Sequence, residues 1–312
     1  MLSQTTRLGD DARRDSPERR YAMTYLDYAA RGRNAGWRYV LALVLGFMFA
    51  VVVGGVALLP LQLGGVLSKD WMTAAQDPGQ PVFFFLFNGV VFGLLLLGVA
   101  LAVWWVQKKR PTDLLGWWSW RLFGLGGAVW LVALTAAALI DFAIAPSGFR
   151  ISAGPGTPQL ALAALAGLAF QTFAEEYIFR GHITQGLMLA IKKPLPAALV
   201  SGLIFGAVHL PNGPPQAASA TVFGVIMAMI AIRTRGIAFT SGLHLVNNVF
   251  GAVVLVSAGD AFRGSPGFFS QDTPHLMWWD MAVGSVALLV VALLVRSARW
   301  LPEPAVPAQN AA

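Results

Sequence analysis

The 312-residue sequence contains no cysteine, which excludes disulfide bonds and every metal site that depends on cysteine ligands. It is also poor in charge, because Asp, Glu, Lys and Arg make up only 12% of the chain, about half the fraction usual for a soluble domain. Hydrophobic residues make up 56% of it. This composition is typical of a protein that crosses a membrane several times.

Several apolar runs are long enough to cross a hydrocarbon core of ~30 Å, which takes about 20 helical residues. We predict an all-α, polytopic membrane protein with about eight transmembrane helices. The expected spans are 39–60, 82–106, 122–140, 159–179, 195–210, 217–232, 237–257 and 277–295. The fifth and sixth of these runs are the shortest.

The positive charges are distributed very unevenly between the two ends of these spans. The formal net charge is +7, which taken alone could indicate a nucleic-acid partner. With a cytoplasmic N-terminus, however, only Lys69, Arg150 and Arg263 of the 22 Lys and Arg residues fall outside. This positive-inside pattern predicts that both termini are cytoplasmic. We therefore expect the protein to have the lipid bilayer as its partner, and we expect no nucleic-acid partner.

The polar residues divide the chain into four segments. We expect residues 1–36 to be a polar, mobile cytoplasmic tail and 301–312 to be a second cytoplasmic tail. Residues 37–147 hold the leading three transmembrane helices, and residues 148–300 hold nearly all the unusual polar residues within spans. Two outer loops, 148–159 and 258–276, are rich in Gly, Pro and Ser, as loops are.

The stretch FAEEYIFRG, residues 173–181, brings three charges to the end of an apolar run. On a helix, Glu176 and Arg180 are four residues apart and share a face, so they can form an ion pair. Glu175 points elsewhere and shares its face with Gln171. The spacing therefore allows one glutamate to be structural and the other to be free for acid or base chemistry.

Two further apolar helices contribute histidine. His209 follows one of them, and His244 lies four residues before Asn248 on the other, so that these two share a face. Ionisable residues within spans are rare and usually line a cavity. Their depths match that of Glu175 only if its helix continues past Arg180 to about residue 191, which we predict. For Asn247, packing is the expected role, and for Gln171 a hydrogen bond between helices.

These residues resemble the three motifs of the CAAX prenyl protease 2 family, also called CPBP (CAAX proteases and bacteriocin-processing enzymes) or Abi. The resemblance covers about residues 160–257, and its motifs are EExxxR (Glu175, Glu176, Arg180), FxxxH (Phe205, His209) and HxxxN (His244, Asn248). It implies an intramembrane endopeptidase in which Glu175 activates the attacking water. His209 would help to bind or orient that water.

The same resemblance implies the remaining roles. His244 and Asn248 would face the developing oxyanion as donors, and Glu176 with Arg180 would hold the helix and the site together. A zinc ion could be held by Glu175, His209 and His244, since Glu with two His is a plausible zinc set. No HExxH motif is present, however, and we favour a glutamate-centred mechanism without a tightly held metal.

The expected substrate is a peptide or protein, which in the family's eukaryotic branch is a prenylated C-terminal tail. We expect cleavage near the cytoplasmic side, in a bacterial inner (cell) membrane, with a role in peptide maturation, bacteriocin processing or immunity, or defence. One alternative is a non-catalytic bacteriocin-immunity or binding protein on the same fold. Another is a proton-coupled transporter, although the chain lacks internal repeats and, apart from Asp280 near the start of the last predicted span, only Glu175 and Glu176 are acidic residues within the predicted spans.

Overall fold

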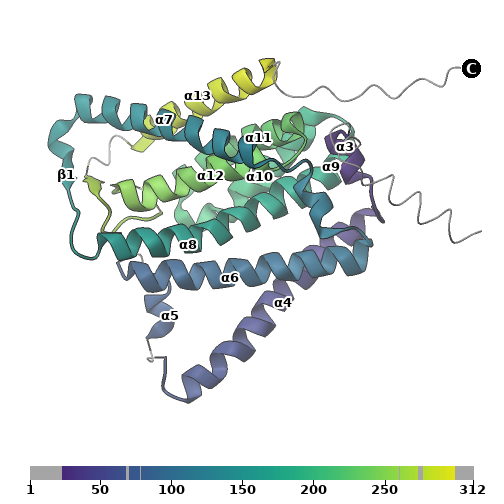
Figure 1. The fold of residues 1–312 in the computed structure, drawn as a ribbon, viewed down its shortest axis with the longest axis horizontal. Coiled ribbons are helices and arrows are strands. Elements are labelled where there is room, and N and C mark those ends of the chain that lie inside the picture. The colour runs from purple at the N-terminus through teal and green to yellow at the C-terminus, as the bar shows by residue number, and fades with distance from the viewer. Residues whose placement is uncertain (1–22, 68–69, 78, 260, 273–276, 299–312) are drawn as a thin grey trace, which may run out of the picture.

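The computed structural model describes residues 23–67, 70–77, 79–259, 261–272 and 277–298. The predicted C-terminal tail, 301–312, and residues 1–22 of the predicted N-terminal tail lie outside this part of the chain. Within it, the protein is mostly a bundle of helices (Figure 1). The long helices are α4 (Gly36–Leu63), α6 (Pro81–Ala102), α7 (Trp120–Ile144), α8 (Thr157–Glu176), α10 (Pro194–Val208), α11 (Pro214–Thr234), α12 (Ala238–Val249) and α13 (Met277–Ser297).

Shorter elements connect or extend these helices. They are α3 (Tyr25–Ala29), α5 (Trp71–Ala74), α9 (Thr184–Ile191), the 3-10 turns Pro111–Leu115, Pro146–Gly148 and Leu210–Asn212, and π-helical turns at Val103–Gln107, Tyr177–Ile183 and Phe250–Val254. Each of the eight predicted runs is helical over most of its length. In the described residues, four helices are long and apolar enough to cross a membrane, Gly36–Leu63, Pro81–Gln107, Trp120–Ile144 and Pro214–Thr234, and three shorter ones are apolar. The number of crossings remains a prediction.

The fold is not purely helical, which corrects the all-α prediction. A small sheet joins β1 (Phe149–Ile151), β2 (Leu255–Ser257) and β3 (Phe269–Gln271) in the order β1-β3-β2. In the register of the sheet, Ser270 lies opposite Arg150 in the antiparallel pair and opposite Val256 in the parallel pair. The sheet is built from the two loops predicted to lie outside and from the end of the seventh span. Pairing these segments satisfies backbone groups that would otherwise lack partners.

Glycines allow the central helices to approach closely. A Cβ on Gly167 of α8 would lie 2.0 Å from the carbonyl oxygen of Phe85 in α6, and one on Gly242 of α12 would lie 1.9 Å from that of Phe123 in α7. Small residues at such crossings are a common way to pack helices within a membrane. These contacts join α6 to α8 and α7 to α12, and so connect the leading helices to the segment that carries the motifs.

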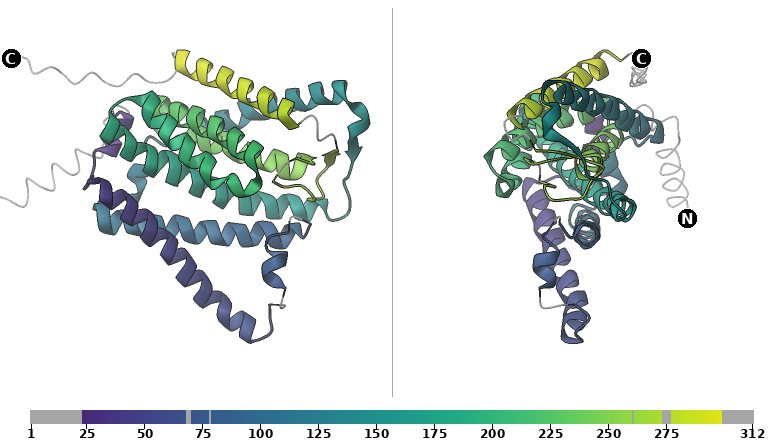
Figure 2. Two further views of the ribbon diagram at one scale, coloured as in Figure 1. Left: turned by 180° about the vertical axis from the view of Figure 1, so that it is seen from behind. Right: turned by 90° about the vertical axis from the view of Figure 1, so that its left-hand side faces the viewer.

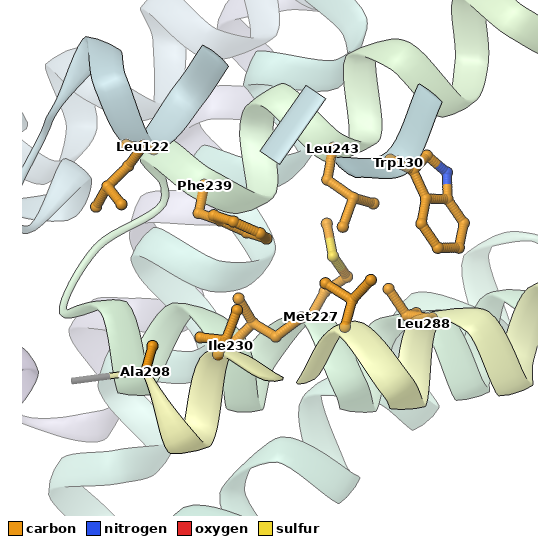
Figure 3. Packing of buried hydrophobic residues seen from close by; sticks show 11 residues of the cluster. Leu122, Trp130, Met227, Ile230, Phe239, Leu243, Leu288 and Ala298 are labelled. Atoms are coloured by element: carbon orange, nitrogen blue, oxygen red, sulfur yellow. The ribbon is translucent and has the colours of Figure 1, made fainter. Parts of the chain in front are cut away.

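A buried apolar cluster holds α7, α11, α12 and α13 together (Figure 3). Its members include Leu122, Trp130, Met227, Ile230, Phe239, Leu243, Leu288 and Ala298. Figure 3 shows the side chains from α7 and α12 facing those from α11 and α13. The cluster fixes α12, and with it His244, relative to the rest of the bundle.

The two ends of the bundle differ in composition. Helices α3 and α9 lie at one end, the sheet lies at the other, and both ends of the described chain lie at the α3 end (Figures 1 and 2). The α3 end carries the segments rich in Lys and Arg, and we call it the cationic end. The other is the sheet end.

Residues 25–29 are not part of a free tail, in contrast to the prediction for residues 1–36. They form α3, in which Tyr25, Tyr28 and Ala29 are buried. The ammonium group of the buried Lys109 donates to the Ala29 carbonyl over 2.8 Å, and burial lowers the pKa of Lys109 to about 8. The apolar faces of these residues explain the docking, because exposing them to water would cost free energy.

Candidate active site

The glutamate helix continues past Arg180, as predicted. Helix α8 passes without a break into the π-helical turn Tyr177–Ile183 and then into α9, which ends at Ile191. The turn changes the hydrogen-bond pattern next to the two glutamates. π-helical turns inside α-helices occur frequently at functional sites.

Glu176 is held by two basic side chains. Its Oε1 atom lies 3.0 Å from the guanidinium of Arg180 and accepts a hydrogen bond of 2.9 Å from Nδ1 of His244. Glu176 and Arg180 are completely buried. The guanidinium also lies over the ring of Phe205, 4.4 Å from its centre. Removing Glu176 or Arg180 would leave a buried charge uncompensated. The hydrogen bond between Glu176 and His244 links α8 to α12.

Glu175 has different partners from its neighbour. Its Oε1 atom accepts a hydrogen bond of 3.2 Å from Gln171, and its Oε2 atom lies 3.6 Å from Nε2 of His244. Gln171 therefore serves its own helix, not a neighbouring helix as we expected. The predicted division of the two glutamates is present in the geometry: Glu176 pairs with Arg180, and Glu175 faces elsewhere.

The two histidines each present one ring nitrogen for further chemistry. Nδ1 of His209 lies 2.7 Å from the carbonyl oxygen of Phe205, and since a carbonyl only accepts, Nδ1 carries the hydrogen. Its Nε2 is then left as an acceptor. His244 donates from Nδ1 to Glu176, so its Nε2 edge is the one that faces Glu175.

Asn248 is oriented by a chain of hydrogen bonds that the sequence did not predict. Nε1 of Trp130 donates to Oδ1 of Asn247 over 3.0 Å, and Nδ2 of Asn247 donates to Oδ1 of Asn248 over 3.2 Å. Because its oxygen is engaged, Asn248 presents its amide N–H groups as donors. Asn247 is thus more than a packing residue, which corrects our expectation. The only sequence signal for it was its position beside Asn248.

A cavity of about 980 Å³ brings the predicted residues together. Glu175, His209, His244 and Asn248 all line it, as do Trp130, Gln171 and Asn247. Glu176 and Arg180 do not line it and support it from behind. Polar side chains that line a cavity between helices usually mark a binding or catalytic site in a helical membrane protein.

The candidate metal ligands do not form a metal-binding cluster. Across the part of the chain that the structure describes, no three His, Cys, Asp or Glu side chains come together in a way that could hold a metal ion. Glu175, His209 and His244 share the cavity wall but do not converge on one point as a zinc site requires. We therefore derive no step of the chemistry through a metal.

Comparison with known proteins agrees with these motifs. Residues 157–250 match the family model described as Type II CAAX prenyl endopeptidase Rce1-like. The chain is also similar to the uncharacterized protein YyaK of Bacillus subtilis (strain 168), with 27% identity over 266 residues that cover 79% of this chain and 87% of that protein. No solved structure matches the chain.

The matched segment includes all six predicted site residues and both glycine-mediated helix contacts of α8 and α12. The match to an endopeptidase family of this type, together with the long apolar helices, indicates a multi-pass membrane protein. From residue 157 to residue 250, the chain is therefore similar to a domain of the Rce1-like type II CAAX prenyl endopeptidase family.

Proposed function

We propose that the protein is an intramembrane endopeptidase in which Glu175 activates water to hydrolyse a peptide bond. One observation carries this proposal: of two adjacent buried glutamates, Glu176 is paired with Arg180, whereas Glu175 lines the cavity and has Gln171 and His244 beside it. A carboxylate that is not neutralised by a fixed cation can accept a proton, as a general base must.

The reaction then follows from the positions of these groups. A water molecule between Glu175 and Nε2 of His209 gives a proton to Glu175, and its oxygen attacks the carbonyl carbon of the scissile bond. The oxyanion that forms receives hydrogen bonds from the amide of Asn248 and from Nε2 of His244 when that nitrogen is protonated. Removing one such donor costs about 3 kcal/mol of transition-state stabilisation in other proteases. Glu175 passes the proton to the leaving nitrogen as the C–N bond breaks.

Glu176 would support this chemistry without taking part in it. As a carboxylate it accepts from Nδ1 of His244, and this contact holds the ring so that Nε2 faces Glu175. Its second partner is Arg180. The two glutamates therefore have different surroundings although they are neighbours in sequence.

The substrate is proposed to be a peptide or protein, and the similarity to CAAX prenyl endopeptidases makes prenylated C-terminal sequences one class to test. Because one similar protein is bacterial, we propose a bacterial cell membrane as the location. No observation favours a role in bacteriocin processing over other peptide maturation.

The test uses purified full-length protein in liposomes and a library of quenched peptides that includes lipidated C-terminal sequences. We expect wild type to cleave a subset of the library, and Glu175→Gln to cleave it roughly 100-fold or more slowly with an unchanged unfolding temperature. Glu176→Gln is the matched control, and it should lower the unfolding temperature because it leaves Arg180 buried without its carboxylate partner.

Two results would contradict the proposal. The first is cleavage by Glu175→Gln at the wild-type rate, which would mean that another group activates the water. The second is a folded wild-type protein that cleaves no member of the library, which would favour a non-catalytic binding role. The unfolding temperatures separate both results from simple loss of the folded protein.

A further inference from the structure

The cavity that contains Glu175 extends toward the sheet end of the bundle. Beyond the predicted site, its lining includes Gln76 after α5, Asn212 and Gln216 at the start of α11, Ser257 in β2 and Arg263 in the following loop. All of these belong to segments that the charge distribution places on the non-cytoplasmic side. The lining contains no residue from 100–129, 180–204 or 224–243, and its members nearest the cationic end are Leu43 in α4 and Val99 in α6.

The cationic end of the bundle is closed by packing directly below the glutamates. The hydroxyl of the buried Tyr25 donates to the Arg180 carbonyl, and Gln185 donates to the Asp113 carbonyl over 2.9 Å. The segment 111–117 is fastened on its other side, since the backbone N–H of Trp117 donates to the Arg235 carbonyl over 2.8 Å. These contacts hold the segments between the cationic end and the two glutamates together.

The walls of the cavity suit a peptide in an extended conformation. Phe84, Phe92 and Phe262 supply apolar surface, while the side-chain amides of Asn88 and Gln216 can both donate to and accept from a peptide backbone. The volume of about 980 Å³ is at the upper end of the range for ligand pockets. The cavity is therefore large enough for more than the scissile bond alone.

We propose that the substrate peptide enters from the sheet end, which the positive charges place on the non-cytoplasmic side of the membrane. The substrate class is accordingly a peptide segment that is exposed at, or emerges from, the outer surface. This inference rests on the proposed function and differs from our sequence-based expectation of cleavage near the cytoplasmic side. That expectation depended on the depth of Glu175 along its helix, which does not reveal where the cavity opens.

The absence of cysteine allows a direct test by single-cysteine labelling. Ser219→Cys places a thiol on the cavity wall in α11, close in size to the native hydroxyl. Ala153→Cys in the exposed loop after β1 and Lys193→Cys before α10 are the accessibility controls for the two sides. Each variant is treated with a charged thiol reagent that does not cross membranes, in right-side-out and in inside-out membrane vesicles.

We expect the Ser219→Cys and Ala153→Cys variants to be labelled in right-side-out vesicles, and the Lys193→Cys variant only in inside-out vesicles. Labelling of Ser219→Cys from the same side as Lys193→Cys would overturn the proposal. So would labelling from neither side, which would indicate a cavity that is open only to lipid. Repeating the labelling in the Glu175→Gln background should give the same pattern, because accessibility does not require catalysis.

Comparing the labelling pattern with the cleavage of peptides separates the two proposals. If labelling follows the expected pattern but no peptide is cleaved, the cavity faces outward and the protease assignment fails. If peptides are cleaved but Ser219→Cys is labelled from the cytoplasmic side, the protease assignment holds and outward entry fails. A bulky adduct on Ser219→Cys should in addition lower the cleavage rate at least tenfold if the peptide passes this wall.

Discussion

At the level of single residues, local spacing was enough to predict different partners for the two glutamates. Residues four apart on a helix share a face, so the sequence alone assigns Arg180 to Glu176 and Gln171 to Glu175. The link from Glu176 to His244 joins residues 68 positions apart and could not be predicted from spacing. Asn247 was misjudged for the same reason, because its partner Trp130 is 117 positions away.

Asn247 is expected to act by positioning Asn248. In Asn247→Ala, the oxygen of Asn248 loses its donor and the side chain is free to turn, so the oxyanion loses an oriented donor. We expect kcat to fall about 10–100-fold, as for other residues that orient a catalytic group, with little change in KM. The kinetics of peptide cleavage measure both constants.

A matched control and a double variant make this prediction specific. Asn88→Ala removes another amide from the cavity wall, one that donates to Phe84 of its own helix and can contact the bound peptide, so it should leave kcat nearly unchanged and act on KM alone. Trp130→Phe should lower kcat as well, and the double variant with Asn247→Ala should be no worse than Asn247→Ala alone, since both act through one chain. Additive losses would show that Trp130 acts separately.

At the level of elements, the sequence predicted that the glutamate helix continues but not its geometry. The apolar spacing of Ile183 and Leu187 indicated helix, and helix is present. Side-chain hydroxyl groups also donate to carbonyl groups of the π-helical turn, from Thr184 at 2.8 Å to Phe179 and from Tyr25 to Arg180. Tyr25 lies 155 positions from Arg180, in a segment that its polar surroundings marked as a tail.

Tyr25→Phe should destabilise this turn. The substitution removes only the hydroxyl and leaves the buried Arg180 carbonyl without that donor, which typically costs about 1–3 kcal/mol. Burial also raises the pKa of Tyr25, so its hydroxyl stays protonated and the bond persists in mildly alkaline solution. We expect a lower unfolding temperature in detergent together with a lower cleavage rate, because the turn holds the glutamates.

The control for this variant is Tyr39→Phe. The Tyr39 hydroxyl donates to Asn34 over 2.8 Å, and the Asn34 side chain is partly exposed and can bind water instead. The loss of stability should therefore be smaller than for Tyr25→Phe. Equal losses in the two variants would mean that the Arg180 carbonyl finds another partner.

The crossing of α7 and α12 gives a prediction on packing. A Cβ on Gly126 would lie 2.1 Å from the carbonyl oxygen of Phe239, whereas a Cβ on Gly124, two residues earlier in α7, would meet nothing within 4 Å. Gly126→Ala should therefore push the helices apart and destabilise the protein by about 1–3 kcal/mol. Gly124→Ala should be neutral or slightly stabilising, because Ala favours helix by about 1 kcal/mol over Gly. Measuring the unfolding free energies of the two variants in detergent tests whether α7 and α12 cross this closely.

At the level of the whole molecule, composition and apolar runs predicted the helices and their order, but three features depended on assembly. The strands of the sheet are three residues long, which is too short to show the alternation of apolar and polar residues that indicates a strand. The docking of α3 and the direction of the cavity depend on contacts between distant segments. The asymmetry of charge, in contrast, was visible in the sequence, and the structure shows that both ends of the described chain lie at the cationic end (Figure 1).

That shared position leads to a prediction on orientation in the membrane. Chain ends on one side require an even number of crossings, and the positive-inside rule makes that side cytoplasmic. A fluorescent protein that folds only in the cytoplasm should therefore fluoresce when fused after the last residue. A phosphatase that needs disulfide bonds should be inactive there, yet active when inserted after Gly154, in the exposed loop between β1 and α8. The reverse pattern would show that the bundle has the opposite orientation in the membrane. The cavity, with the same geometry, would then open to the cytoplasm.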